Sequence, residues 1–166
     1  MMRQMPVSWG NFSAPFLDEV SAHLRGKRVL EVFAGNGLLA KGLTERGVDI
    51  RSTSLFSGID GHDQGMHFPV EKIEASDAVD RYGPWADALL MSWPPANEAA
   101  AKCVVRWGKD RDVIFIGEMT RPELGFAGLG GCGSDLLFAN TSVHHRFLSY
   151  VGRGFLDVAV SLRMIE

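Results

Sequence analysis

The chain is poor in cysteine and has no strong excess of either charge. Its 166 residues include only Cys103 and Cys132, too few for a disulfide framework or a cysteine-rich metal site. The formal net charge is -3, which gives no broad electrostatic attraction to nucleic acid. General nucleic-acid binding is therefore not expected, and any such contact would have to be local.

Long apolar runs are missing as well. No window approaches the roughly 18 consecutive apolar residues of a membrane span, and residues 1–9 have no apolar core of a signal peptide. We therefore expect a cytoplasmic protein without a membrane partner. Aspartate and histidine gather at residues 60–67, but their spacing (Asp60, His62, Asp63, His67) matches no standard metal template, so no metal is expected.

What the sequence does contain is an ordinary globular composition, 46% hydrophobic and 22% charged. A chain of this length buries roughly 70% of its unfolded surface as one domain. We expect a single domain over residues 1–166, with residues 1–26 as an N-terminal helical extension. Ser13 and Pro15, followed by Asp18 and Glu19, are typical of a helix start.

Apolar strands and helical patterns alternate from residue 28 onward. Strands are predicted at 28–34, 48–54, 70–74, 86–92 and 112–118, with helices at 37–46, 77–82 and 96–107. After a glycine-rich loop at 119–133, a short helix is expected at 134–140 and two strands at 143–150 and 155–164. Repeated β-then-α order predicts a doubly wound sheet. The expected fold is a three-layer α/β fold with a mostly parallel seven-stranded sheet and a C-terminal antiparallel hairpin.

The most informative segment is residues 28–40, where an apolar strand runs into a glycine turn that opens a helix. Gly35, Gly37 and Ala40 satisfy the G-x-G-x-x-G/A pattern of a nucleotide-cofactor loop. Glu31 lies inside the strand, where an ionised carboxylate is costly unless a cation or a hydrogen-bond donor meets it. The predicted cofactor loop consists of Phe33, Ala34, Gly35, Asn36 and Gly37.

The acidic side chain favours S-adenosylmethionine over a dinucleotide, because the former carries a sulfonium and an ammonium and has no phosphate. Dinucleotide folds also place an acid about 20 residues past the glycines. Residues 51–55 hold no carboxylate, and Ser54 stands at the strand end. A second interpretation is a plain strand-turn-helix in which the N–H groups of the turn bind Glu31.

Three segments stand out between residues 28 and 118: the glycine loop, Asp77-Ala78 after the third predicted strand, and 92–95 (Ser-Trp-Pro-Pro) after the fourth. With these segments, the chain resembles class I, Rossmann-like S-adenosylmethionine-dependent methyltransferases. More narrowly, the chain looks like a largely uncharacterised methyltransferase-like group that also has Phe-Ile-Gly-Glu and Gly-Gly-Cys segments. The resemblance implies that Glu31 and the glycine turn face the methionyl part of the cofactor. It also implies that Asp77, followed by Ala78, accepts from the adenine amine, and that Ser54 takes the ribose position.

Candidate catalytic residues follow the fourth and fifth strands, namely Ser92, Trp93, Pro94 and Glu118. In amino-methylating enzymes, a polar residue followed by two prolines and an aromatic residue holds the target amine, but in this chain the motif is permuted, because Trp93 stands between Ser92 and the prolines. Here Ala96 occupies the aromatic position, and Trp93 is a candidate for the aromatic wall. We expect Glu118 to orient the substrate first and to act as a base second. The alternatives are a helix start at the prolines and a carboxylate that fixes the following loop.

The leading prediction is a methyltransferase that moves a methyl group from S-adenosylmethionine to an amine or hydroxyl of an unidentified small or macromolecular acceptor. The alternative is a non-catalytic Rossmann-like binding protein that has lost or weakened its use of the cofactor. A nicotinamide-dependent oxidoreductase is a third reading of the glycine pattern, but it lacks the ribose acid and a recognisable catalytic set.

Overall fold

A computed structural model describes residues 9–55, 65–120 and 132–165. A seven-stranded sheet has the order β3-β2-β1-β4-β5-β7-β6, in which β1 to β5 run parallel and β7 is antiparallel to both β5 and β6. The strands are β1 (Arg28–Val32), β2 (Asp49–Ser54), β3 (Val70–Lys72), β4 (Ala88–Ser92), β5 (Val113–Glu118), β6 (Thr141–Arg146) and β7 (Asp157–Met164). The mostly parallel sheet with an antiparallel C-terminal hairpin is thereby confirmed.

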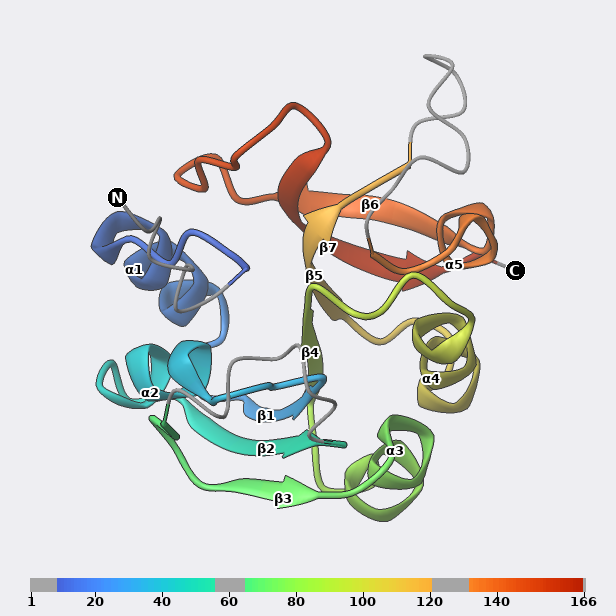
Figure 1. The fold of residues 1–166 in the computed structure, drawn as a ribbon. Helices are drawn as coiled ribbons and strands as arrows, with labels where there is room; N and C mark the ends of the chain where they lie inside the picture. The colour runs from blue at the N-terminus through green and yellow to red at the C-terminus, as the bar shows by residue number, and fades with distance from the viewer. Residues whose placement is uncertain (1–8, 56–64, 121–131, 166) are drawn as a thin grey trace.

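Helices cover both faces of this sheet, as Figure 1 shows, with α1 and α2 on one side and α3, α4 and α5 on the other. They are α1 (Ala14–His23), α2 (Leu38–Thr44), α3 (Ala75–Tyr82), α4 (Ala99–Trp107) and α5 (Asp135–Ala139). The core accordingly has two halves. Phe16 of α1 packs with Ile114 on one face, while Trp107 of α4 packs with Leu89 on the other. The three-layer α/β prediction is confirmed.

The first helix belongs to the core. Ser13 caps it by accepting the Phe16 N–H at 3.4 Å, and a proline follows in the first turn. Phe16 and Val20 are completely buried. Residues 1–26 thus include an element on which α2 and the sheet depend for burial.

Two predicted helix boundaries differ from the structure. The helix expected at 77–82 begins at Ala75, because the Glu74 carboxylate accepts the N–H groups of Ser76 and Asp77 at 2.9 and 3.2 Å. The helix expected at 96–107 begins at Ala99, whose N–H donates to Asn97 Oδ1 at 2.9 Å. At α3 the side chain of the N-cap residue decides the start of the helix, whereas at α4 the N-cap Glu98 makes no side-chain capping bond and the Asn97 side chain, one residue earlier, accepts instead.

The strand expected at 143–150 runs instead from Thr141 to Arg146. Its register against β7 shifts between Val143 and His145. Beyond it, Phe147 still donates its N–H to Ala159 O at 3.0 Å. Asp60, His62 and Asp63, as well as most of the expected loop at 119–133, lie outside the described residues.

No group of three or more His, Cys, Asp or Glu side chains in the described ranges is arranged to hold a metal ion. Among the same residues, every helix is too short or too polar to cross a lipid bilayer.

Candidate functional site

Two hollows lie where the parallel strands end, at the edge of the sheet where open α/β folds bind ligands. The smaller one, of about 40 Å³, lies over the glycine loop and is lined by Trp9, Phe12, Glu31, Phe33, Ala34, Gly35, Asn36, Leu38, Leu39, Ser92 and Trp93. The larger one, of about 590 Å³, is lined by Trp9, Phe33, Ser54, Leu55, Ile73, Glu74, Ala75, Trp93, Pro94, Pro95, Ala96, Asn97, Ala99 and Glu118. The three aromatic residues shared by both make them one connected site.

Glu31 is the buried acid of the smaller hollow. Its side chain is 1% exposed, and Ser52 Oγ donates to its Oε2 at 2.7 Å. Burial raises the pKa of the carboxyl group to about 8, against a smaller lowering by the Ser52 hydroxyl. The group therefore keeps its proton at neutral pH until a positive charge enters the hollow and stabilises the anion.

The backbone of the glycine loop is turned sharply toward this hollow. Phe33 and Gly35 both have φ of 58°, and only glycine adopts this conformation without strain. The buried Asn36 side chain accepts the Leu38 N–H at 3.1 Å and so fixes the entry to α2. Ala34 donates its N–H to Thr53 O at 3.0 Å, which ties the loop to β2.

Gly37 has a structural role in addition to the one that its motif suggests. Its φ is 78°, and a Cβ atom at this position would lie 2.8 Å from Phe68 Cβ and 3.1 Å from Phe68 O. The small side chain is required because residues 67–68 pack against the loop, where His67 N donates to Asn36 O at 2.8 Å. Gly37 is absent from the residues that line the two hollows, so its contribution to a ligand site is through the shape of the turn.

Trp93 sits at the end of β4 in a strained conformation with φ of 50°. A residue of this kind costs about 1–3 kcal/mol and persists only where its surroundings hold it. The Trp93 N–H donates to Ile116 O at 2.7 Å. Ser92 lines the smaller hollow beside it and Pro94 the larger one. The structure thus brings the three predicted residues of this segment to the site.

Glu118 ends β5 at the rim of the larger hollow, beside a cysteine that sequence reasoning left without a role. Its N–H donates to Cys132 Sγ at 2.8 Å, and the thiol donates back to Glu118 O at 3.4 Å. Burial raises the pKa of Cys132 to about 12, so the sulfur remains a thiol. Gly117, with φ of 151°, leaves room for that sulfur, because a Cβ atom there would clash with it. Cys132 therefore fixes the backbone that presents Glu118.

The structure differs from expectation at Asp77 and Ala78, neither of which lines either hollow. The Asp77 side chain is 69% exposed, with Oδ1 4.0 Å from Arg106 Nη1, and Ala78 lies on the buried face of α3 in the core. The reason is the early helix start, which places Glu74 at the strand end and Asp77 within the first turn. Glu74 lines the larger hollow together with the buried Ser54.

Sequence reasoning also missed Trp9 and Phe12. The Trp9 ring stacks on Trp93 with centroids 6.0 Å apart and an interplanar angle of 27°. The segment is tied to the β6–β7 connection, because Asn11 Nδ2 donates to Val151 O at 2.9 Å. A contact between residues so far apart in the chain leaves no local pattern that could have revealed it.

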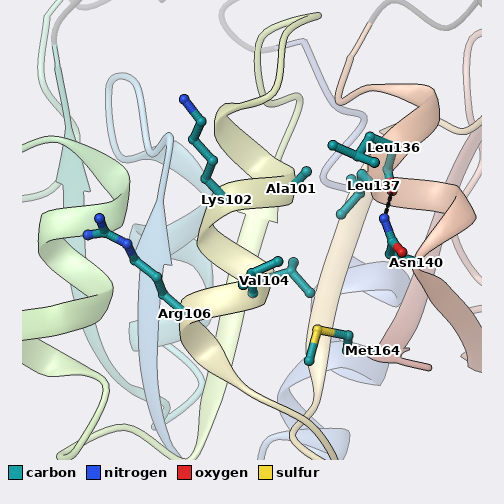
Figure 2. Close-up of a pocket in the computed structure, with 9 residues that line it drawn as sticks. Ala101, Lys102, Val104, Arg106, Leu136, Leu137, Asn140 and Met164 are labelled. Carbon is teal, nitrogen blue, oxygen red and sulfur yellow. Dashed lines mark hydrogen bonds between the residues drawn. The ribbon is translucent and has the colours of Figure 1, made fainter. Parts of the chain in front are cut away.

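A separate apolar pocket of about 240 Å³ lies between α4, α5 and the end of β7 (Figure 2). Its floor includes Val104, Leu137 and Met164, while Lys102 and Arg106 extend from the same helix. It shares no lining residue with the two hollows at the strand ends. Cys103 and Leu137 of the core lie beneath this surface, so the pocket is a surface extension of helix packing.

Comparison with known proteins gives the fold a name. No protein-family model matches the sequence, and no curated protein matches it either. Solved structures do match. The chain is similar to ribosomal protein L11 methylase from Lactobacillus delbrueckii subsp. bulgaricus, with a TM-score of 0.54 and 14% identity over 92% of this chain and 77% of the other.

Two further structures are similar to the chain. A TehB-like S-adenosylmethionine-dependent methyltransferase from Corynebacterium glutamicum has a TM-score of 0.54 and 14% identity over 95% of this chain and 90% of its own. Human N-acetylserotonin methyltransferase, solved with S-adenosylmethionine, has a TM-score of 0.55 and 12% identity over 92% of this chain and 52% of its own. The chain therefore has the Rossmann-like fold of S-adenosylmethionine-dependent methyltransferases.

Proposed function

We propose that this chain is a methyltransferase that takes its methyl group from S-adenosylmethionine. The observation that carries the proposal is Glu31, a buried carboxyl group at the carboxyl end of a central strand, facing a hollow beside a strained glycine turn. A cationic ligand suits that group, because a positive charge offsets the cost of ionising a buried acid. A pyrophosphate would instead repel it.

The residues of the site fit the parts of the cofactor. Glu31, Gly35 and the neighbouring loop would hold the methionyl group, and Ser54 would hydrogen-bond the ribose. Glu74 lines the larger hollow, and we assign to it the adenine amine that the resemblance assigns to Asp77. A neutral hydroxyl at position 54 binds a ribose less strongly than a carboxylate would, by about 1 kcal/mol. We therefore expect modest cofactor affinity.

The bound cofactor supplies an electrophilic methyl group on a positively charged sulfur. The acceptor nitrogen or oxygen forms a bond to that methyl carbon, and the electrons of the broken carbon–sulfur bond remain on sulfur as a neutral thioether. The acceptor proton leaves to Glu118 or to water. Positioning supplies most of the rate in such a transfer, and Ser92, Trp93, Pro94 and Glu118 are the residues that would position the acceptor.

Isothermal titration with S-adenosylhomocysteine and, separately, with NAD tests the cofactor. The wild type is expected to bind the first and not the second. Glu31→Gln keeps the shape of the side chain and removes the charge, so binding should weaken roughly tenfold to a hundredfold, as expected for a lost hydrogen bond to a charged group. Glu45→Gln, an exposed glutamate at the end of α2, is the matched control. Unchanged binding by Glu31→Gln would overturn the assignment.

One observation favours the alternative of a binding protein without turnover. The hollow next to Glu31 measures only about 40 Å³, and Trp9 and Phe12 of the chain itself line it. A methionyl group of ordinary size would have to move these rings. Incubation with S-adenosylmethionine and a cell extract separates the two functions, because turnover releases S-adenosylhomocysteine in excess over the enzyme, whereas a binding protein releases none.

A further inference from the structure

Trp9 and Trp93 form an aromatic wall that belongs to both hollows. The rings stack with centroids 6.0 Å apart, and both residues line the smaller and the larger cavity. Trp9 is still 49% exposed, so the contact with Trp93 leaves a large part of the indole uncovered. An exposed indole face at the rim of a ligand site is a stacking surface for a second planar ring.

The wall is held in place from two directions. Trp93 is fixed by its backbone, which donates to Ile116 O at 2.7 Å, and Trp9 by Asn11, whose side chain donates to Val151 O at 2.9 Å. Next to Val151, the Tyr150 hydroxyl donates to Asp157 Oδ1 at 2.7 Å. Because these bonds need no ligand, the backbone that carries the two indoles is in place before the acceptor arrives.

The charged residues around the aromatic wall limit the chemical class of the acceptor further. Glu118 and Glu74 are the charged side chains among the described residues that line the larger hollow, and neither hollow has a lysine, arginine or histidine in its described lining. A phosphate would have no cation to meet there. Pro94, Pro95 and Ala96 add flat apolar surface beside Trp93.

We infer that the methyl acceptor is a planar aromatic ring that bears an N–H or O–H group and no phosphate at the reacting end, and that Trp9 selects it by stacking. This inference rests on the proposed function. The nitrogen or oxygen of that group forms the new bond to the methyl carbon, sulfur keeps the electrons of the broken carbon–sulfur bond, and the displaced proton passes to Glu118 or to water. Trp9 thereby supplies the aromatic surface that Ala96 does not.

The test compares two neutral compounds of similar size that each bear one hydroxyl group, naphthol and decahydronaphthol, in the presence of saturating S-adenosylhomocysteine. Their dissociation constants are measured by ligand-observed NMR for the wild type, Trp9→Ala, Trp9→Phe and Leu148→Ala. Leu148 is 87% exposed and lines neither hollow, so its variant controls for the loss of surface apolar area. Naphthyl phosphate is added as an anionic probe.

The wild type is expected to bind naphthol about tenfold more tightly than decahydronaphthol, as one stacking contact allows, and naphthyl phosphate more weakly than naphthol. Trp9→Ala should abolish the tenfold preference, while Trp9→Phe and Leu148→Ala keep it. Equal binding of naphthol and decahydronaphthol by the wild type, or an unchanged preference in Trp9→Ala, refutes the inference about the acceptor. If S-adenosylhomocysteine still binds in that case, the proposed function stands. Failure of the wild type to bind S-adenosylhomocysteine refutes the proposed function, and the acceptor assignment with it.

Discussion

Replacing Glu31 by glutamine should make the protein more resistant to alkaline pH. Burial raises the pKa of this carboxyl group from its ordinary 4.5 to about 8. Between those values the folded protein holds a proton that the unfolded chain has released, so stability is fully present below pH 4.5 and is lost as pH rises toward 8. At about 1.4 kcal/mol per pH unit, the wild type should lose about 2 kcal/mol between pH 6 and pH 8 through Glu31 alone.

Glutamine does not titrate, and its amide oxygen can still accept the Ser52 hydroxyl that donates to Glu31 in the wild type. Urea denaturation of both proteins at pH 6 and pH 8 measures the effect. Other titrating groups, such as the partly buried His23, are common to both proteins and cancel in the comparison. The expected result is that the wild type loses about 2 kcal/mol more than Glu31→Gln over this interval. Equal losses would show that the carboxyl group is ionised throughout, and that the hollow is not a low-dielectric site.

Three more predictions follow from the same residues. Binding of S-adenosylhomocysteine should lower the pKa of Glu31 and release a proton. The affinity should therefore rise from pH 6 to pH 8, and the calorimetric enthalpy of binding should differ between phosphate and Tris buffers. An enthalpy that is the same in both buffers would contradict this proton release. Ser52→Ala removes the hydrogen bond that lowers the pKa of Glu31, so the affinity of this variant for S-adenosylhomocysteine at pH 7 should fall several-fold. Recovery of the affinity at pH 9 would show that the loss is due to protonation of Glu31. Gly37→Ala should destabilise the fold by about 1–3 kcal/mol more than Gly47→Ala. Both positions have positive φ, but only a Cβ atom at position 37 would crowd Phe68. Equal urea midpoints of the two variants would show that the contact with Phe68 does not require glycine at position 37.

The order of elements and the location of the site could be predicted because both depend on local patterns. Apolar runs that follow a glycine mark β1, β4 and β5, and parallel strands bring their carboxyl ends to one edge. Glu31, Ser92 and Glu118 therefore had to lie near one another, whatever the details of packing. The structure places all three at the hollows of that edge.

Helix starts were less predictable, because several residues compete to cap the same helix. Glu74, Ser76 and Asp77 are all able to accept backbone N–H groups at the start of α3, and the sequence does not say which one does. The structure selects Glu74. Because the helix starts two residues earlier than predicted, Glu74 instead of Asp77 lines the larger hollow. Motif spacing alone therefore does not decide which acid lies at the site, since that depends on which residue caps the helix.

The strained residues explain why the site exists before any ligand binds. Phe33 and Trp93 both have positive φ, follow the neighbouring strands β1 and β4, and line both hollows. Such backbone conformations persist only when the surrounding structure fixes them, and the bonds that do so lead into adjacent strands: Ala34 N–H to Thr53 O, and Trp93 N–H to Ile116 O. The sheet therefore fixes the backbone of the site before any ligand binds, whereas the Trp9 and Phe12 rings have to move to admit a methionyl group. Relief of strain at either position should accordingly stabilise the fold while it loosens the aromatic wall, which is the trade-off expected where structure serves binding.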